Sequence, residues 1–222
     1  MNVLAIDAST YTGTVAVLRD TTLAAECETA MRGRDVERLM PAVAEALGAA
    51  GVVPDALDFI VCGAGPGSFT SLRIAASIAK GLAFSRQIPL RAVSSLVLMV
   101  AGLESAPAAG RYVAVLDALR GESYVQAIES SAADGGIRAL EPPRILPNGD
   151  VDAFAESQGA VTVGVGQRVV AAPHARGVQR LLPSGGAELA VVDAASWEPD
   201  YGRLAEAQVR WEAAHGRPLP PG

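Results

Sequence analysis

Aromatic residues, cysteines and histidines are all scarce in this chain of 222 residues. Aromatics make up only 5% of the sequence, so the core must be built from the aliphatic side chains that dominate its 50% hydrophobic content. Cys27 and Cys62 lie in apolar segments without a CxxC pair, which predicts core thiols in a reducing compartment rather than a disulfide framework. His174 and His215 are isolated from other ligand types, so we expect both to be solvated, with no metal site and no cofactor.

Basic charge and long apolar runs are also lacking. The chain carries 18 Lys and Arg against 24 Asp and Glu, a net charge of -6. This balance argues against a broad tRNA- or DNA-binding face, because phosphate binding needs clustered Lys and Arg. No apolar run is long enough to span a bilayer, and Asp7 interrupts the first run early, which is not typical of a signal peptide. We therefore expect a soluble, cytoplasmic protein with no membrane partner.

The apolar patterning predicts an α/β protein. Strands are predicted for short β-rich runs at residues 3–6, 14–18, 23–27, 59–62, 112–116, 123–128 and 161–165. Helical periodicity predicts helices over residues 36–50, 70–85, 95–104 and 203–215. The pattern is weak between Ser130 and Ser196, where Gly and Pro pairs interrupt it.

One strand–turn–strand pattern occurs twice. The segments VLAIDASTYTGTVAV and VAVLDALRGESYVQAI each place an apolar strand before Asp7 or Asp117, then a polar turn with Gly, then a returning strand. Asp is favoured in hairpin turns for its own reasons, but the repetition predicts two related lobes. We assign residues 1–106 to an N-terminal lobe and residues 107–222 to a smaller C-terminal lobe with a terminal helix.

A Gly-rich segment, residues 63–70, joins a predicted strand to a predicted helix. Helix N-terminal amides can hold a phosphate at such a place, but the segment matches neither the Walker loop nor the dinucleotide fingerprint. A tight turn, whose glycines permit close backbone packing, is the favoured interpretation. The candidate nucleotide-binding or turn residues are Asp7, Ser9, Thr10, Gly65, Gly67 and Asp117.

The segment 70–85 is apolar on almost every side, so its helix must be covered on more than one side. Burial within the same chain is the common case, but we favour a partner-facing pair formed with the helix at 36–50. The expected partner-binding residues are Leu39, Val43, Leu47, Leu72, Arg73, Ala75, Ala76, Ala79, Leu82 and Ala83. No catalytic residue is predicted.

Five sequence blocks occur in the order typical of the TsaB family. They are AIDAST near the start, GPGSFTSLRIAASIAKGLA at 65–83, AVSSL at 92–96, DALRGESYV at 117–125 and EPDYGR at 198–203. The chain resembles this family over most of residues 1–129 and a short C-terminal block, and the segment 65–70 with Arg73 is the most specific part. The resemblance implies an actin-like, Hsp70-like fold with two ribonuclease-H-like lobes, the second of them reduced.

The resemblance also implies a non-catalytic subunit. TsaD, the catalytic relative, binds metal through a His-x-x-x-His pair. The resemblance implies that Ser95 and Met99 of this chain occupy the positions of those two histidines. The implied role is a scaffold that docks TsaD through the helices at 36–50 and 70–85, with the ATPase TsaE joining them, to form threonylcarbamoyladenosine in tRNA. The tRNA is then contacted only indirectly, and a homodimer through the same helices is an alternative pairing.

Two rival functions come from the wider fold group. A metallopeptidase of the glycoprotease type needs the His pair that this sequence lacks. An actin-like small-molecule kinase needs an adenosine pocket between two full lobes and a catalytic acid.

Overall fold

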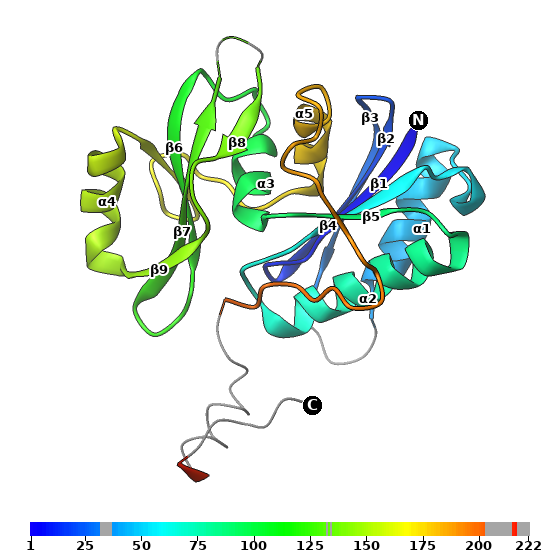
Figure 1. Ribbon diagram of the computed structural model, residues 1–222, viewed down its shortest axis with the longest axis horizontal. Helices are drawn as coiled ribbons and strands as arrows, with labels where there is room; N and C mark the ends of the chain where they lie inside the picture. The colour runs from blue at the N-terminus through cyan, green and yellow to red at the C-terminus, as the bar shows by residue number, and fades with distance from the viewer. Residues whose placement is uncertain (32–36, 132, 134, 203–214, 217–222) are drawn as a thin grey trace.

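The computed structural model describes residues 1–31, 37–131, 133, 135–202 and 215–216 (Figure 1). Two mixed β-sheets carry helices on their outer faces and between them. The first sheet has six strands in the order β11-β5-β4-β1-β2-β3, and the second has five, β10-β6-β7-β8 with β9 also beside β7. This arrangement confirms the predicted α/β class, with two lobes of mixed sheets flanked by helices.

The strands of the first sheet are β1 (Asn2–Asp7), β2 (Thr12–Arg19), β3 (Thr22–Ala30), β4 (Phe59–Gly63), β5 (Leu90–Val93) and β11 (Ala190–Val192). Those of the second are β6 (Gly110–Asp117), β7 (Glu122–Ser130), β8 (Ile137–Ala139), β9 (Arg144–Pro147) and β10 (Val161–Gly164). The helices are α1 (Leu39–Ala50), α2 (Phe69–Arg86), α3 (Ser95–Ala101), α4 (Val151–Gln158) and α5 (Val178–Leu181), with 3-10 turns at Pro54–Ala56, Asn148–Asp150 and Ala175–Gly177.

The repeated hairpin begins each sheet in the same way. β1 and β2 are antiparallel, with Asp7 opposite Thr14, and β6 and β7 are antiparallel, with Asp117 opposite Ser123. β1 then pairs in parallel with β4, and β6 pairs in parallel with β10. Each lobe therefore repeats a hairpin followed by a crossover to a parallel strand.

The helices divide the molecule into layers around three apolar cores. α1 and α2 pack on one face of the first sheet, and α4 packs on the outer face of the second (Figure 1). α3 and α5 lie between the two sheets, and all seven residues of α3 are buried. No helix among the described residues is long and apolar enough to cross a membrane.

The expectation that the apolar ridge of α2 faces a partner is wrong for most of its residues. Ala75, Ala79 and Ala83 pack in the core of their own chain, where the exposed fraction of Ala79 is 0%. Eight expected partner-binding residues are buried in this way: Leu39, Val43, Leu47, Leu72, Ala75, Ala76, Ala79 and Ala83. Only Arg73 is exposed, and Leu82 is half-buried. The physical reason is that α2 is covered by the first sheet on one side and by residues 197–202, here called the strap, on another.

The chain beyond residue 107 contributes to both sheets. β11 pairs antiparallel with β5 of the first sheet, and the strap also returns to the first lobe. The division at residues 106 and 107 stays a prediction. The predicted terminal helix lies outside the described residues, apart from His215.

Candidate functional site

Asp7 lies at the end of β1 in a buried polar node with Ser9 and Ser95. Its Oδ1 accepts hydrogen bonds from the backbone N–H of Ser9 at 3.0 Å and from the Ser9 hydroxyl at 2.7 Å. Its Oδ2 accepts the Ser95 hydroxyl at 2.5 Å, and the Ser95 Oγ accepts the N–H of Gly65 at 3.1 Å. Burial raises the pKa of Asp7, although the hydrogen bonds from Ser95 and Ser9 oppose that shift. The carboxyl group therefore joins the first hairpin turn, the start of α3 and the Gly-rich segment.

Close backbone contact explains two glycines of the Gly-rich segment. A Cβ at Gly65 would lie 2.1 Å from the carbonyl oxygen of Asp200, and one at Gly67 would lie 2.1 Å from the carbonyl oxygen of Ser9. The N–H of Ser68 donates to that same Ser9 oxygen at 2.7 Å. Gly65 and Gly67 therefore allow the backbone to pack closely in a tight turn. Nucleotide binding by these residues stays a prediction.

A cleft of about 1830 Å³ opens between the two hairpin turns. Thr10 and Tyr11 line it from the first turn, and Leu119 and Arg120 line it from the second. Asp117 also lines the cleft, where its Oδ1 accepts the N–H of Leu119 at 2.8 Å. The two hairpin aspartates thus differ, because Asp7 is fully buried and Asp117 is exposed.

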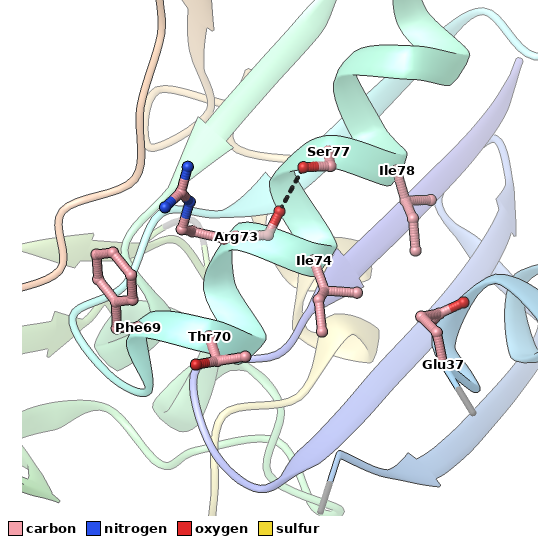
Figure 2. Close-up of a pocket in the computed structure, with 7 residues that line it drawn as sticks. All are labelled: Glu37, Phe69, Thr70, Arg73, Ile74, Ser77 and Ile78. Carbon is pink, nitrogen blue, oxygen red and sulfur yellow. Dashed lines mark hydrogen bonds between the residues drawn. The ribbon is translucent and has the colours of Figure 1, made fainter. Parts of the chain in front are cut away.

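A smaller hollow of about 490 Å³ follows the outer side of α2 (Figure 2). It is called the groove here, and its lining residues are Glu37, Phe69, Thr70, Arg73, Ile74, Ser77 and Ile78. Apart from Glu37, they recur every four residues along α2, which places them on one helix face. Figure 2 shows Phe69 and Arg73 at one end, where the guanidinium lies 5.3 Å from the ring centroid. The groove is mainly apolar and has an exposed cation at one end.

Sequence reasoning placed only Arg73 of these groove residues in the binding set. It missed Phe69, Ile74 and Ile78, because the segment is apolar on nearly every side and its pattern does not show which helix face is buried. The available signal was the spacing of four residues between Phe69 and Arg73 and between Ile74 and Ile78.

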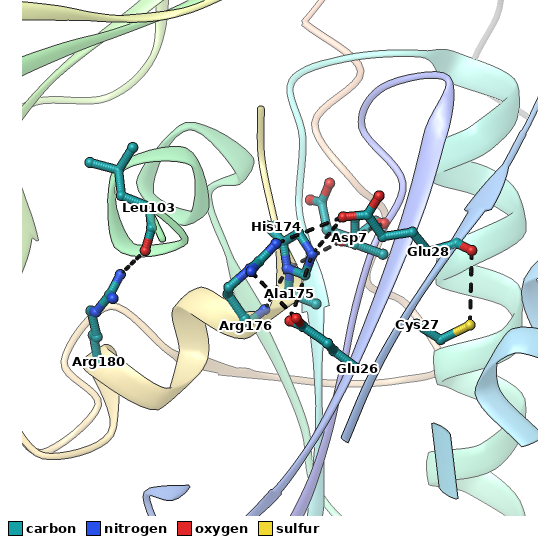
Figure 3. Close-up of polar contacts among 10 residues, drawn as sticks. Asp7, Glu26, Cys27, Glu28, Leu103, His174, Ala175, Arg176 and Arg180 are labelled. Atoms are coloured by element: carbon teal, nitrogen blue, oxygen red, sulfur yellow. Dashed lines mark hydrogen bonds and ion pairs between the residues drawn. The ribbon is translucent and has the colours of Figure 1, made fainter. Parts of the chain in front are cut away.

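A cluster of charged groups ties the Ala175–Gly177 turn to the edge strand β3 (Figure 3). The Nδ1 of His174 accepts the N–H of Arg176 at 3.0 Å, so neutral His174 carries its proton on Nε2, which lies 3.0 Å from Oε1 of Glu28. Arg176 pairs with Oε1 of Glu26 at 3.4 Å. His174 is buried, so the expectation of a solvated histidine is wrong: residues far apart in sequence cover it.

The pKa of His174 is lowered from its usual value near 6.5. Burial is the largest cause and the charge of Arg176 adds to it, together outweighing the opposing effects of Glu26 and Glu28. Folded protein therefore binds this proton more weakly than unfolded protein does. The contribution of His174 to stability is fully present above pH 6.5 and is lost as the pH falls toward the lowered pKa.

We expect His174→Asn to flatten the pH dependence of stability just below pH 6.5. Asn retains a side-chain oxygen that can accept the N–H of Arg176, but it has no group that titrates in this range. Urea unfolding at pH 7.0, 6.5, 6.0 and 5.5 measures the free energy of unfolding of both proteins. A loss of stability between pH 7.0 and 5.5 that is equal in both would contradict this assignment.

No group of three or more His, Cys, Asp or Glu residues in the described part of the chain is arranged to hold a metal ion. Ser95 and Met99 both have exposed fractions of 0%. The Ser95 hydroxyl is held by Asp7, and Met99 packs in the core between the sheets.

Known proteins resemble this chain in sequence and in fold. The family described as "TsaD: tRNA N6-adenosine threonylcarbamoyltransferase" matches residues 30–158. The tRNA threonylcarbamoyladenosine biosynthesis protein TsaB of Bacillus subtilis strain 168 is 32% identical over 232 residues, which cover 95% of this chain and 98% of the relative. The protein of the same name in Escherichia coli K12 is 37% identical over 124 residues, covering 56% of this chain and 53% of the relative.

Solved structures resemble this chain over both lobes as well. The crystal structure of an uncharacterized Pseudomonas aeruginosa protein with similarity to the peptidase YeaZ superposes with a TM-score of 0.77 at 30% identity. The superposition covers 91% of this chain and 99% of that protein.

Proposed function

This chain belongs to the TsaB family, and from that premise we propose that it is a non-catalytic subunit in the formation of N6-threonylcarbamoyladenosine in tRNA. The observation that carries the proposal is the end-to-end correspondence with a TsaB protein, 95% of this chain against 98% of the relative. TsaD is the proposed catalytic partner, and TsaE is proposed to join the two.

The chemistry around α3 supports a non-catalytic role. Ser95 and Met99 stand where the TsaD pattern, as the sequence resemblance implies it, has two histidines. The Ser95 hydroxyl is already bonded to Asp7, and the Met99 side chain is packed among aliphatic residues. Ser95 and Met99 therefore contribute to folding rather than to metal binding. The burial of Asp7 also counts against the kinase alternative, because this carboxyl group does not reach the surface of the cleft.

We place the docking of TsaD at the groove rather than at the alanine ridge. Ile74 and Ile78 are half-buried, and they offer apolar surface between Arg73 and the start of α1. Exposed apolar surface beside a cation suits a partner segment that carries apolar side chains and a carboxylate. A second copy of this chain is an alternative occupant of the same groove.

Reconstitution from purified proteins tests the proposed role. We expect this chain alone to form no modified nucleoside from tRNA and threonylcarbamoyl-adenylate, and we expect product when TsaD and TsaE from the same genome are added. Mass spectrometry of the digested tRNA measures N6-threonylcarbamoyladenosine directly. Product from this chain alone, free of TsaD, would show that it is the catalyst, and unchanged product when it is omitted would show that it has no role.

A further inference from the structure

The strap crosses the flank of α2 in a fixed path. The N–H of Asp200 donates to the carbonyl oxygen of Ala64 at 2.7 Å, and the Asp200 carbonyl lies against Gly65. Pro199 is buried, and Trp197 packs against the core under α1 and α2. Figure 1 shows this segment, in orange, running beside α2. The strap is therefore held by the backbone of Asp200 and by the packing of Trp197 and Pro199.

Those remaining side chains form a continuous series of contacts along the outer side of α2. The Nζ of Lys80 lies 2.9 Å from Oε1 of Glu198, and the Tyr201 hydroxyl donates to Oε2 of the same carboxylate at 2.8 Å. The Tyr201 ring then meets the Phe69 ring, with 4.5 Å between the centroids and 48° between the planes. The Arg73 guanidinium lies over the Phe69 ring, 5.3 Å from its centroid. The series ends at two residues of the groove.

The Lys80–Glu198 ion pair in this series adds little to the stability of the chain itself. Glu198 has an exposed fraction of 61% in its ion pair with Lys80, and exposed pairs contribute little. The series of contacts as a whole has a conformational consequence. A free Phe69 or Arg73 side chain on a helix surface samples several rotamers, and a partner must immobilise them on binding. Contacts that hold both side chains beforehand remove part of that cost.

We propose that Tyr201, held by Glu198, is a positioning residue that fixes Phe69 and Arg73 in the conformation that TsaD recognises. The inference rests on the proposed docking at the groove and adds to it a requirement for the strap. The expected partner surface places an apolar side chain against the Phe69 ring and a carboxylate at Arg73. Tyr201 acts through these two residues.

A double-mutant cycle tests the positioning role. We expect Tyr201→Ala to weaken TsaD binding about 10-fold, because two side chains lose their support. We expect Tyr201→Phe, which keeps the ring contact and loses only the hydroxyl, to weaken it about 2-fold. In a Phe69→Ala, Arg73→Ala background, Tyr201→Ala should have almost no further effect, because nothing is left to position. Isothermal titration of each full-length variant with TsaD measures these affinities, and thermal melting shows that each is folded.

The outcomes separate this inference from the proposed function. If Tyr201→Ala weakens binding equally in both backgrounds, Tyr201 touches TsaD itself or acts through the fold, and the positioning role is overturned while docking stands. If the wild-type chain does not bind TsaD, both proposals fail. If Tyr201→Ala does not fold, Glu198→Gln replaces it in the cycle: a loss of affinity confined to the background with Phe69 and Arg73 supports the role, and an equal loss in both overturns it.

Discussion

Ala79→Arg is expected to destabilise the folded state severely, whereas Ser77→Arg, two residues earlier on the same helix, is expected to leave it intact. Ala79 has an exposed fraction of 0% and packs against the first sheet with Ala75 and Ala83. An Arg there must force the helix off the sheet or bury an unpaired charge, which costs about 3–5 kcal/mol. That is a large part of the total of about 5–15 kcal/mol that stabilises a typical domain.

Ser77 is exposed and lines the groove, so the same side chain at this position remains in water. The Ser77 hydroxyl donates only to the Arg73 carbonyl within the helix, and its loss should change stability by about 0.5 kcal/mol at most. The added bulk should instead block the groove and weaken TsaD binding by about 10-fold or more. Thermal melting and titration with TsaD measure both effects on both variants.

The pair distinguishes the inner face of α2 from the outer one. Normal melting of Ala79→Arg would contradict the burial of the alanine ridge. Normal TsaD affinity of Ser77→Arg would remove the groove from the interface, and the interface would then be sought on another surface.

Gly63→Ala is expected to destabilise the protein by about 3 kcal/mol or more, which is large for the addition of one methyl group. A Cβ at this position would lie 1.9 Å from Oδ2 of Asp7 and 3.0 Å from Oγ of Ser95. Both atoms belong to the buried node, so neither can move without breaking the hydrogen bond between them. The expected change in melting temperature is a decrease of about 6–12 °C.

Gly81→Ala is the matched control. Gly81 is exposed in the middle of α2, and an added Cβ meets no atom within 4 Å. We therefore expect this change to stabilise the protein by about 0.5–1 kcal/mol, because Ala favours the helix over Gly. Urea unfolding followed by circular dichroism compares the two variants. Equal stability of Gly63→Ala and wild type would mean that the carboxyl of Asp7 is not fixed at β4.

The regular elements were predictable because local patterns determine them. The alternation around Asp7 and Asp117 predicted both hairpins, and the helix over 70–85 matches α2 within one residue at each end. The helix predicted from residue 36 begins at Leu39, so Pro41 falls in its first turn, where a missing N–H costs no helical hydrogen bond.

The parts of the site that were not predicted depend on contacts between distant segments. Ser95 and Asp7 are 88 positions apart, and Lys80 and Glu198 are 118 apart. No local pattern of spacing reports such pairs. The buried face of α2 was missed for a different reason, since the sequence of a helix that is apolar on nearly all sides does not show which face is buried. The EPDYGR block marked the strap as a specific segment, but the role of Tyr201 required the Phe69 contact to be seen.

The return of the chain to the first lobe has a consequence for synthesis on the ribosome. β5 gains its outer neighbour only when residues 190–192 have emerged, and α2 gains its flanking cover only with residues 197–202. A nascent chain that ends before this point has a first sheet with an open edge and an uncovered helix, a state that favours chaperone binding and proteolysis. Translation must therefore reach residues 197–202 before the first lobe has its full set of neighbours.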